Sequence, residues 1–190
     1  MVGDVTDKGV PAALVMATTR TMLRASAQRL NSPGEVLKRV NDVIVPDIPP
    51  NMFITCLYAI LDPATGLLRY ANAGHDLPYR RRRTSNGGAE ELRATGMPLG
   101  LLPGMSYEEK EIVLEEGDSV LFYSDGLVEA HDPERDMFGF PRLQGLVGAH
   151  RSDGPAMVNF LLSELARFTG EEWEQEDDIT LVTLDRSETV

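Results

Sequence analysis

The sequence predicts an α+β domain, in which helices are segregated from runs of antiparallel strands. Apolar residues recur at helical spacing near the N-terminus and again in the last third of the chain. Between these regions lie β-branched and aromatic runs, separated by short loops that contain Gly or Pro. The length of 190 residues and the hydrophobic content of 42% suit one sizeable core. We therefore predict a single domain over residues 1–190.

Two helices are expected first along the chain. Pro11 stands where the first turn of a helix tolerates proline, and this helix is predicted to end near Leu30. Its apolar side is predicted to consist of Val10, Leu14, Ala17, Thr21 and Ala25. The second helix opens with the segment SPGE, which begins at Ser32 and has the pattern of a capping box with proline at the first helical position. Pro46 ends it.

The central region is expected to form strands. FITCLYAIL and LLRYANA are rich in β-branched and aromatic residues and are split by DPATG, which predicts an antiparallel hairpin. Short strands are expected near residues 77–82 and 90–93. A second hairpin is predicted from residues 106–114 and 118–124, with EEGD as its turn. The chain is expected to finish with helices over residues 144–149 and 156–168 and with the strand ITLVTL.

Composition excludes some classes of function. With 18 basic and 30 acidic side chains, the net charge of -12 repels nucleic acid and anionic membrane surfaces. The one basic cluster, Arg80 to Arg83, is interpreted as a solvated edge strand whose charges prevent aggregation. Apolar runs are far shorter than the roughly 18 residues that span a bilayer, so we expect no membrane insertion. The single cysteine, Cys56, and the lack of a secretory signal pattern predict a cytoplasmic protein.

Three acidic positions stand at the ends of apolar strands. They are Asp4 after Gly3, Asp125 before Gly126, and the pair Asp177-Asp178 before ITLVTL. Taken singly, each is better explained as a turn, because Asp and Gly are common turn residues. Taken together they suggest a site for Mg²⁺ or Mn²⁺, since hard divalent cations take several oxygen ligands. A pair of such ions would activate a water molecule to attack a phosphorus atom.

Six segments, in order, resemble the motifs of the SpoIIE/RsbU-type serine phosphatases, which belong to the metal-dependent PPM (PP2C-like) superfamily. They are GDVTDKGVPAALVMA, NMFITCLYAILDPATGLLRYANAGHDLP, GMPLGLLPG, LFYSDGLVEA, MFG and EDDITLVTL, and they cover the chain from Gly3 to about Leu184. The resemblance implies an α-β-β-α sandwich of two antiparallel sheets flanked by helices, with a two-metal site. It also implies hydrolysis of phosphoserine by a metal-bound water.

The resemblance assigns roles to four residues. Asp4 corresponds to a carboxylate shared by both metal ions, and the backbone carbonyl of Val5 to a ligand of one of them. Asp125 and Asp177 correspond to the remaining ligands of the other ion. Asp178 is the less favoured ligand of its pair. The implied substrate is a phosphorylated anti-anti-sigma (STAS-type) protein, and the sensor domains that precede many relatives are not expected in this chain.

The family also has an acidic strand motif just before the GDV segment, and this chain begins too late to contain it. The sequence is therefore interpreted as an N-terminally truncated domain, and three readings stay open: a fragment, an enzyme whose second metal is weakly held, or a domain that has lost catalysis. The alternative is an impaired phosphatase-like module or gene fragment that binds its partner without turnover. A third class, the calcineurin-like phosphoesterases, is disfavoured because the three histidines do not suit its motifs.

Overall fold

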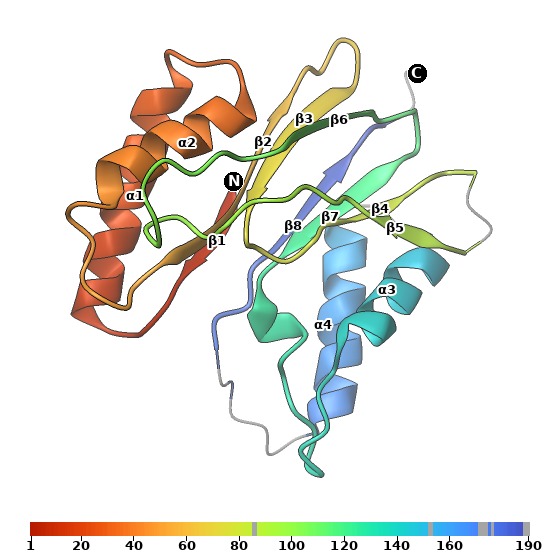
Figure 1. The fold of residues 1–190 in the computed structure, drawn as a ribbon. Coiled ribbons are helices and arrows are strands. Elements are labelled where there is room, and N and C mark those ends of the chain that lie inside the picture. Colours follow the sequence, from red (N-terminus) through yellow and green to blue (C-terminus); the bar gives the residue numbers. More distant parts are fainter. Residues whose placement is uncertain (85–86, 152–153, 171–174, 176, 188–190) are drawn as a thin grey trace. The chain divides into compact units, whose positions relative to one another are not determined.

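The chain folds into two compact units, each built around one antiparallel sheet (Figure 1). The computed structural model describes all residues except 85–86, 152–153, 171–174, 176 and 188–190. Unit 1 comprises Met1–His75 and Arg93–Val113, and unit 2 comprises Asp76–Leu92 and Leu114–Val190. Both sheets have four strands, and both units carry helices. The predicted α+β class with two antiparallel sheets flanked by helices is therefore confirmed.

Unit 1 packs two helices on a sheet of order β1-β2-β3-β6. Its elements are β1 (Val2–Val5), α1 (Val10–Ala27), α2 (Pro33–Ile44), β2 (Ile54–Leu61), β3 (Leu67–Ala73) and β6 (Glu109–Val113). The predicted hairpin of FITCLYAIL and LLRYANA is confirmed as the pair β2 and β3. Ile54, Cys56, Ala71 and Ala73 from these strands share one core with the helices. Because side chains alternate along a strand, residues between these positions lie on the opposite face.

The start of α2 is fixed by side-chain hydrogen bonds, as its sequence predicts. The backbone N–H of Glu35 donates to Ser32 Oγ at 3.2 Å, which is the N-cap bond of the SPGE segment. The hydroxyl of Ser32 in turn donates to the carboxylate of Glu109 at 2.5 Å, and the N–H of Gly34 donates to the same carboxylate. The helix N-terminus is thereby tied to β6, a strand 75 residues further along the chain.

The predicted apolar side of α1 is wrong, because all five of its residues, Val10, Leu14, Ala17, Thr21 and Ala25, are exposed. Val10 and Leu14 are 73% and 64% exposed, whereas Ala12, Thr19 and Leu23 are buried. The helix is apolar on most of its circumference, so spacing alone does not say which side meets the sheet.

Unit 2 has the sheet order β5-β4-β7-β8. Its elements are β4 (Tyr79–Arg81), β5 (Ala89–Glu91), β7 (Ser119–Tyr123), the short 3-10 helix η1 (Asp125–Leu127), α3 (Phe140–Ala149), α4 (Pro155–Thr169) and β8 (Leu181–Asp185). Leu143 of α3 and Leu161 and Leu165 of α4 belong to one buried cluster with Leu121 and Tyr123 of β7. The guanidinium of Arg142 lies 3.9 Å from the ring centroid of Phe168, a cation–π contact between α3 and α4.

The second predicted hairpin does not form, although both of its strands exist. β6 pairs with β3 in unit 1, whereas β7 pairs with β4 and β8 in unit 2. The EEGD turn is held by Asp118, whose carboxylate accepts hydrogen bonds from the backbone of Glu115 and Arg83. The bond to Arg83 ties the turn to the segment that follows β4 in unit 2. The chain accordingly passes from unit 1 to unit 2 at Leu114.

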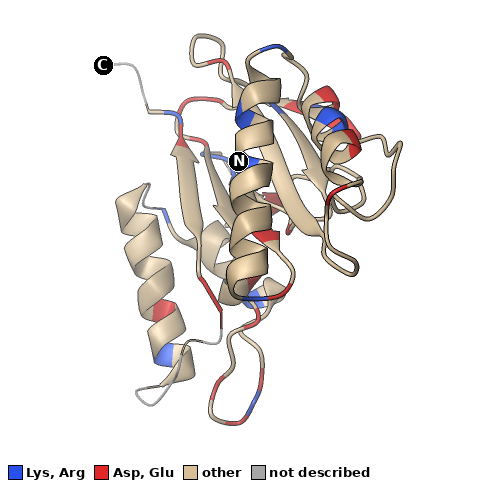
Figure 2. Ribbon diagram, turned by 90° about the vertical axis from the view of Figure 1, so that its left-hand side faces the viewer, with Lys and Arg blue, Asp and Glu red and all other residues tan. Residues whose placement is uncertain are grey.

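Charged residues occur in both units. Figure 2 shows acidic residues along both units rather than in one segment, and the sequence carries a net charge of -12. Among the helices of the described residues, none combines the length and apolar character that crossing a bilayer requires.

Candidate active site

Asp125 stands at the exit of a central strand of unit 2. β7 ends at Tyr123, Ser124 is still extended, and Asp125 opens η1. The backbone carbonyl of Asp125 accepts hydrogen bonds from the N–H groups of Val128 and Glu129, both at 2.9 Å. The backbone thus forms the turn, and the carboxylate of Asp125 is left for other interactions.

Ser124 joins the segment of Asp125 to the segment of Asp177. Its hydroxyl donates to the carbonyl of Asp178 at 3.0 Å and accepts from the N–H of Thr180 at 2.9 Å, while its N–H donates to the carbonyl of Thr180. Two of the acidic positions that the sequence singles out, 52 residues apart, therefore lie on adjoining segments of unit 2. The hydroxyl of Ser124 contacts backbone groups, as in ordinary turn capping.

Gly126 allows this close approach. A Cβ at position 126 would stand 2.6 Å from the carbonyl oxygen of Asp178, closer than real Cβ contacts, and a tight 3.3 Å from that of Asp177. Only glycine therefore lets η1 lie against the loop before β8. The SDG motif is explained by contact between two backbone segments as well as by turn formation.

Gly126→Ala is expected to push these two segments apart. Since the obstructing atoms belong to backbone, they cannot rotate away, and we expect a loss of about 1–3 kcal/mol in the free energy of unfolding. Denaturant unfolding followed by circular dichroism measures it. Gly145→Ala is the matched control, because a Cβ there meets nothing within 4 Å. Equal stability of the two variants would contradict the close approach.

Asp76 is a candidate site residue that the sequence reasoning missed. Its Oδ2 is buried and makes no hydrogen bond to any described residue. Burial, followed by the negative charges of Asp125 and Glu129, raises the pKa of Asp76 to about 6. A divalent cation would satisfy such an oxygen, so the donor chemistry here fits the implied metal. The signal in the sequence is an acid directly after His75, in the segment GHD.

Asp4 lies in unit 1, on β1, at the edge of the sheet. It is directly opposite Thr55 of β2, and Val5 is opposite Ile54. Val5 and Ile54 face the helices in the core, so Asp4 and Thr55 lie on the other face of the sheet. Thr6 continues the pairing of the strands, because its hydroxyl donates to the carbonyl of Phe53 and accepts from the N–H of Phe53.

The predicted metal ligands are thus divided between the units, with Asp4 and Val5 in unit 1 and Asp125 and Asp177 in unit 2. Over the described residues, no three His, Cys, Asp or Glu side chains gather closely enough to hold a metal ion by themselves. The assignment of these four residues as ligands stays a prediction.

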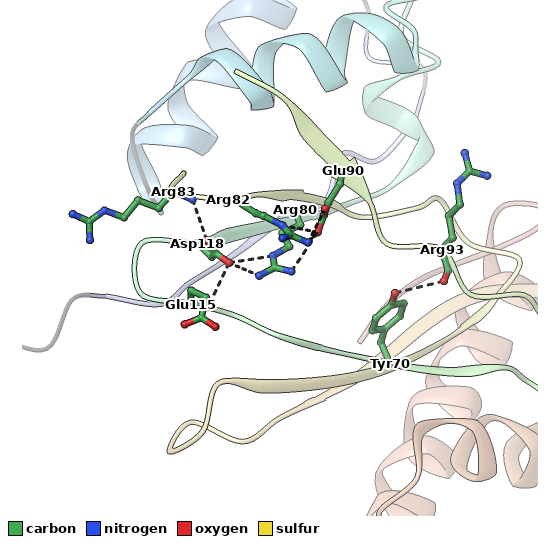
Figure 3. Close-up of polar contacts among 8 residues, drawn as sticks. All are labelled: Tyr70, Arg80, Arg82, Arg83, Glu90, Arg93, Glu115 and Asp118. Carbon is green, nitrogen blue, oxygen red and sulfur yellow. Dashed lines mark hydrogen bonds and ion pairs between the residues drawn. The ribbon is translucent and has the colours of Figure 1, made fainter. Parts of the chain in front are cut away.

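The interpretation of the arginine run as a solvated edge strand is wrong for Arg80 and Arg81, which are buried in β4, whereas Arg82 and Arg83 beyond the strand are exposed. β4 lies between β5 and β7, and the side chain of Arg80 is only 6% exposed. Its guanidinium donates to Asp118 through two nitrogens and to Glu90 at 3.3 Å (Figure 3). Arg82 donates to the same Glu90. These arginines hold the sheet of unit 2 together and have acidic partners of their own, so they are poor candidates for binding phosphate.

Comparison with known proteins shows that the chain is similar to one family of bacterial phosphatases. The sequence model of the Stage II sporulation protein E (SpoIIE) family matches residues 1–187. The phosphoserine phosphatase RsbU of Bacillus subtilis is 31% identical over 186 residues, which are 97% of this chain and 54% of RsbU. The chain therefore spans about half the length of this relative.

Solved structures agree on the fold. The structure of the RsbU and RsbW domains of Rv1364c from Mycobacterium tuberculosis has a TM-score of 0.80 and 30% identity, and the match covers 97% of this chain and 50% of that one. The SiaA-PP2C domain of Pseudomonas aeruginosa has a TM-score of 0.81 at 22% identity, covering 96% and 72%. The PP2C-like fold that the sequence motifs predict is confirmed.

Proposed function

The chain belongs to the SpoIIE family, and we propose that it is a metal-dependent phosphatase domain that hydrolyses phosphoserine on a partner protein. The observation that supports the proposal most is the junction made by Ser124, which joins the segments of Asp125 and Asp177 in unit 2. These are the two acids that the family resemblance assigns to one metal ion. We treat residues 1–190 as a single phosphatase domain of this type.

The proposed ligand set is the one that the resemblance implies. Asp4 would be a ligand shared by both ions, the backbone carbonyl of Val5 would be a ligand of one of them, and Asp125 and Asp177 would be the remaining ligands of the other. When bound, two Mn²⁺ or Mg²⁺ ions would supply Lewis acidity toward the phosphoryl oxygens and would activate a water molecule. Carboxylates suit these ions because both are hard and prefer oxygen ligands. Asp76, whose pKa is raised by burial and by the negative charge of Asp125, adds negative potential near Asp125.

The proposed substrate is a serine-phosphorylated anti-anti-sigma protein of the STAS type. RsbU, a phosphoserine phosphatase by name, supports the phosphoserine specificity. The single cysteine is buried and free, which is compatible with action in a reducing cytoplasm, where we propose that the protein works.

Phosphate release from a serine-phosphorylated STAS protein tests the proposal. We expect turnover that requires Mn²⁺ or Mg²⁺ and stops on chelation with EDTA, and we expect little release from a phosphotyrosine peptide. Phosphate release that EDTA leaves unchanged would contradict the metal dependence. Tight binding of the phosphorylated partner without turnover at any metal concentration would favour the non-catalytic binding module instead.

A further inference from the structure

His75 lies in a loop, yet it is buried and its backbone is held by hydrogen bonds on both sides. It is only 8% exposed, and the side-chain amide of Asn72 contacts both sides of its backbone. Asn72 Oδ1 accepts from the N–H of His75 at 2.7 Å, and Asn72 Nδ2 donates to its carbonyl at 2.8 Å. The backbone of His75 is therefore fixed by a single buried side chain from the end of β3.

The residue before it adds a second constraint. Gly74 has φ +70°, in the left-handed region, and a Cβ there would stand 2.6 Å from Pro98 Cγ. The turn that carries His75 is thus locked by its own conformation and by the loop packed against it. Such support is expected where the orientation of a side chain matters to function.

The imidazole of His75 contacts β2, the strand that pairs with β1, on which Asp4 lies. His75 Nδ1 and Thr55 Oγ1 are 2.9 Å apart and share a hydrogen bond. Thr55 is directly opposite Asp4 in the β1–β2 pairing. Side chains of directly opposed residues lie on the same face of a sheet, with Cβ atoms about 4.5–5.5 Å apart. The side chain of Thr55 therefore has the imidazole of His75 at hydrogen-bond distance and the side chain of Asp4 as its cross-strand neighbour, all within unit 1.

We propose that Thr55 and His75 are positioning residues of the metal centre: the imidazole fixes the Thr55 hydroxyl, and the hydroxyl orients the carboxylate of Asp4. The inference rests on the proposed function, since it takes Asp4 as a metal ligand. Partners of this kind hold a ligand in the geometry that the ion needs, and their loss typically weakens metal binding about 10- to 100-fold.

The experiment measures Mn²⁺ binding to the whole chain by isothermal titration calorimetry, without substrate. We expect Thr55→Val and His75→Ala each to raise the Mn²⁺ dissociation constant about 10- to 100-fold. Thr55→Ser keeps the hydroxyl, and His75→Asn offers an amide at the position of Nδ1, so both should bind nearly as the parent does. His75→Gln, whose amide falls at the position of Nε2, should behave like His75→Ala. The double variant should lose no more affinity than either single one.

Asp4→Asn separates this inference from the function on which it rests. If Asp4→Asn weakens Mn²⁺ binding but Thr55→Val and His75→Ala leave it within twofold, the positioning role is wrong and the ligand assignment stands. If Asp4→Asn itself leaves binding unchanged, the ligand assignment fails and the inference with it. Should His75→Ala not fold, as circular dichroism would reveal, the comparison of Thr55→Val, which replaces the hydroxyl by a methyl, with Thr55→Ser, which keeps the hydroxyl, decides the question.

Discussion

Asp125→Asn is expected to lower turnover of the phosphoserine substrate by on the order of 10³-fold at saturating Mn²⁺. Loss of one carboxylate from a metal site removes several kcal/mol of charge stabilisation from the transition state, and each 1.36 kcal/mol is tenfold in rate. The fold should survive, because the hydrogen bonds of η1 are made to the backbone carbonyl of Asp125, which asparagine retains. Asp177→Asn should have an effect of the same size.

Steady-state phosphate release is the measurement, with Mn²⁺ titrations to distinguish loss of metal from loss of rate. Glu134→Gln is the matched control: it also removes one negative charge, from an exposed loop residue of unit 2. It should leave turnover within twofold. If Asp125→Asn and Asp177→Asn both turn over as the parent does, the ligand assignment is wrong.

The sequence located the acidic positions but could not establish how they are supported. Asp125 and Asp177 were identified from their places at strand ends and from family motifs. The junction between them depends on the hydroxyl of Ser124, whose partners lie more than 50 residues away. Asp76 was missed because its significance comes from burial beside other acids, which only the folded chain reveals.

The fold was predictable where local signals decide it. The start of α2 followed from its capping segment, and the β2–β3 hairpin from a short loop between two β-rich runs. The prediction of the second hairpin was wrong because the sheet that each strand joins is determined by contacts with residues far away in the sequence. Nothing near Asp118 in the sequence indicates that its partner is Arg80, 38 residues earlier. Because this long-range ion pair could not be foreseen, the arginine run was interpreted as a solvated edge.

Asp118→Ala is expected to cost about 3–5 kcal/mol in the free energy of unfolding, the largest effect on stability that we predict. The side chains of Asp118 and Arg80 are only 3% and 6% exposed. The variant would therefore leave the guanidinium of Arg80 buried without the carboxylate of Asp118. The loss should fall toward the lower end, because Glu90 still accepts a hydrogen bond from Arg80. Denaturant unfolding followed by circular dichroism measures it.

Glu90→Gln is the comparison that separates burial from charge. Glu90 also pairs with Arg80, but its side chain is 42% exposed, so its loss should cost no more than about 1 kcal/mol. Asp118→Asn should fall between the two, because the amide oxygen still accepts hydrogen bonds from the turn. A cost below about 1 kcal/mol for Asp118→Ala would mean that Arg80 reaches solvent or another acid.

The same pair predicts how stability depends on pH. Burial opposes ionisation of Asp118, but hydrogen bonds from Arg80 and from the N–H groups of Arg83 and Glu115 outweigh it and lower the pKa of this carboxyl. A carboxyl whose pKa is lower in the folded state stabilises the fold above its unfolded value of about 3.9, and this contribution is lost as the pH falls further. Parent and Asp118→Ala should therefore differ most near neutral pH and converge in acid. A difference that stays constant down to about pH 2 would assign the cost of the variant to lost packing rather than to the ion pair.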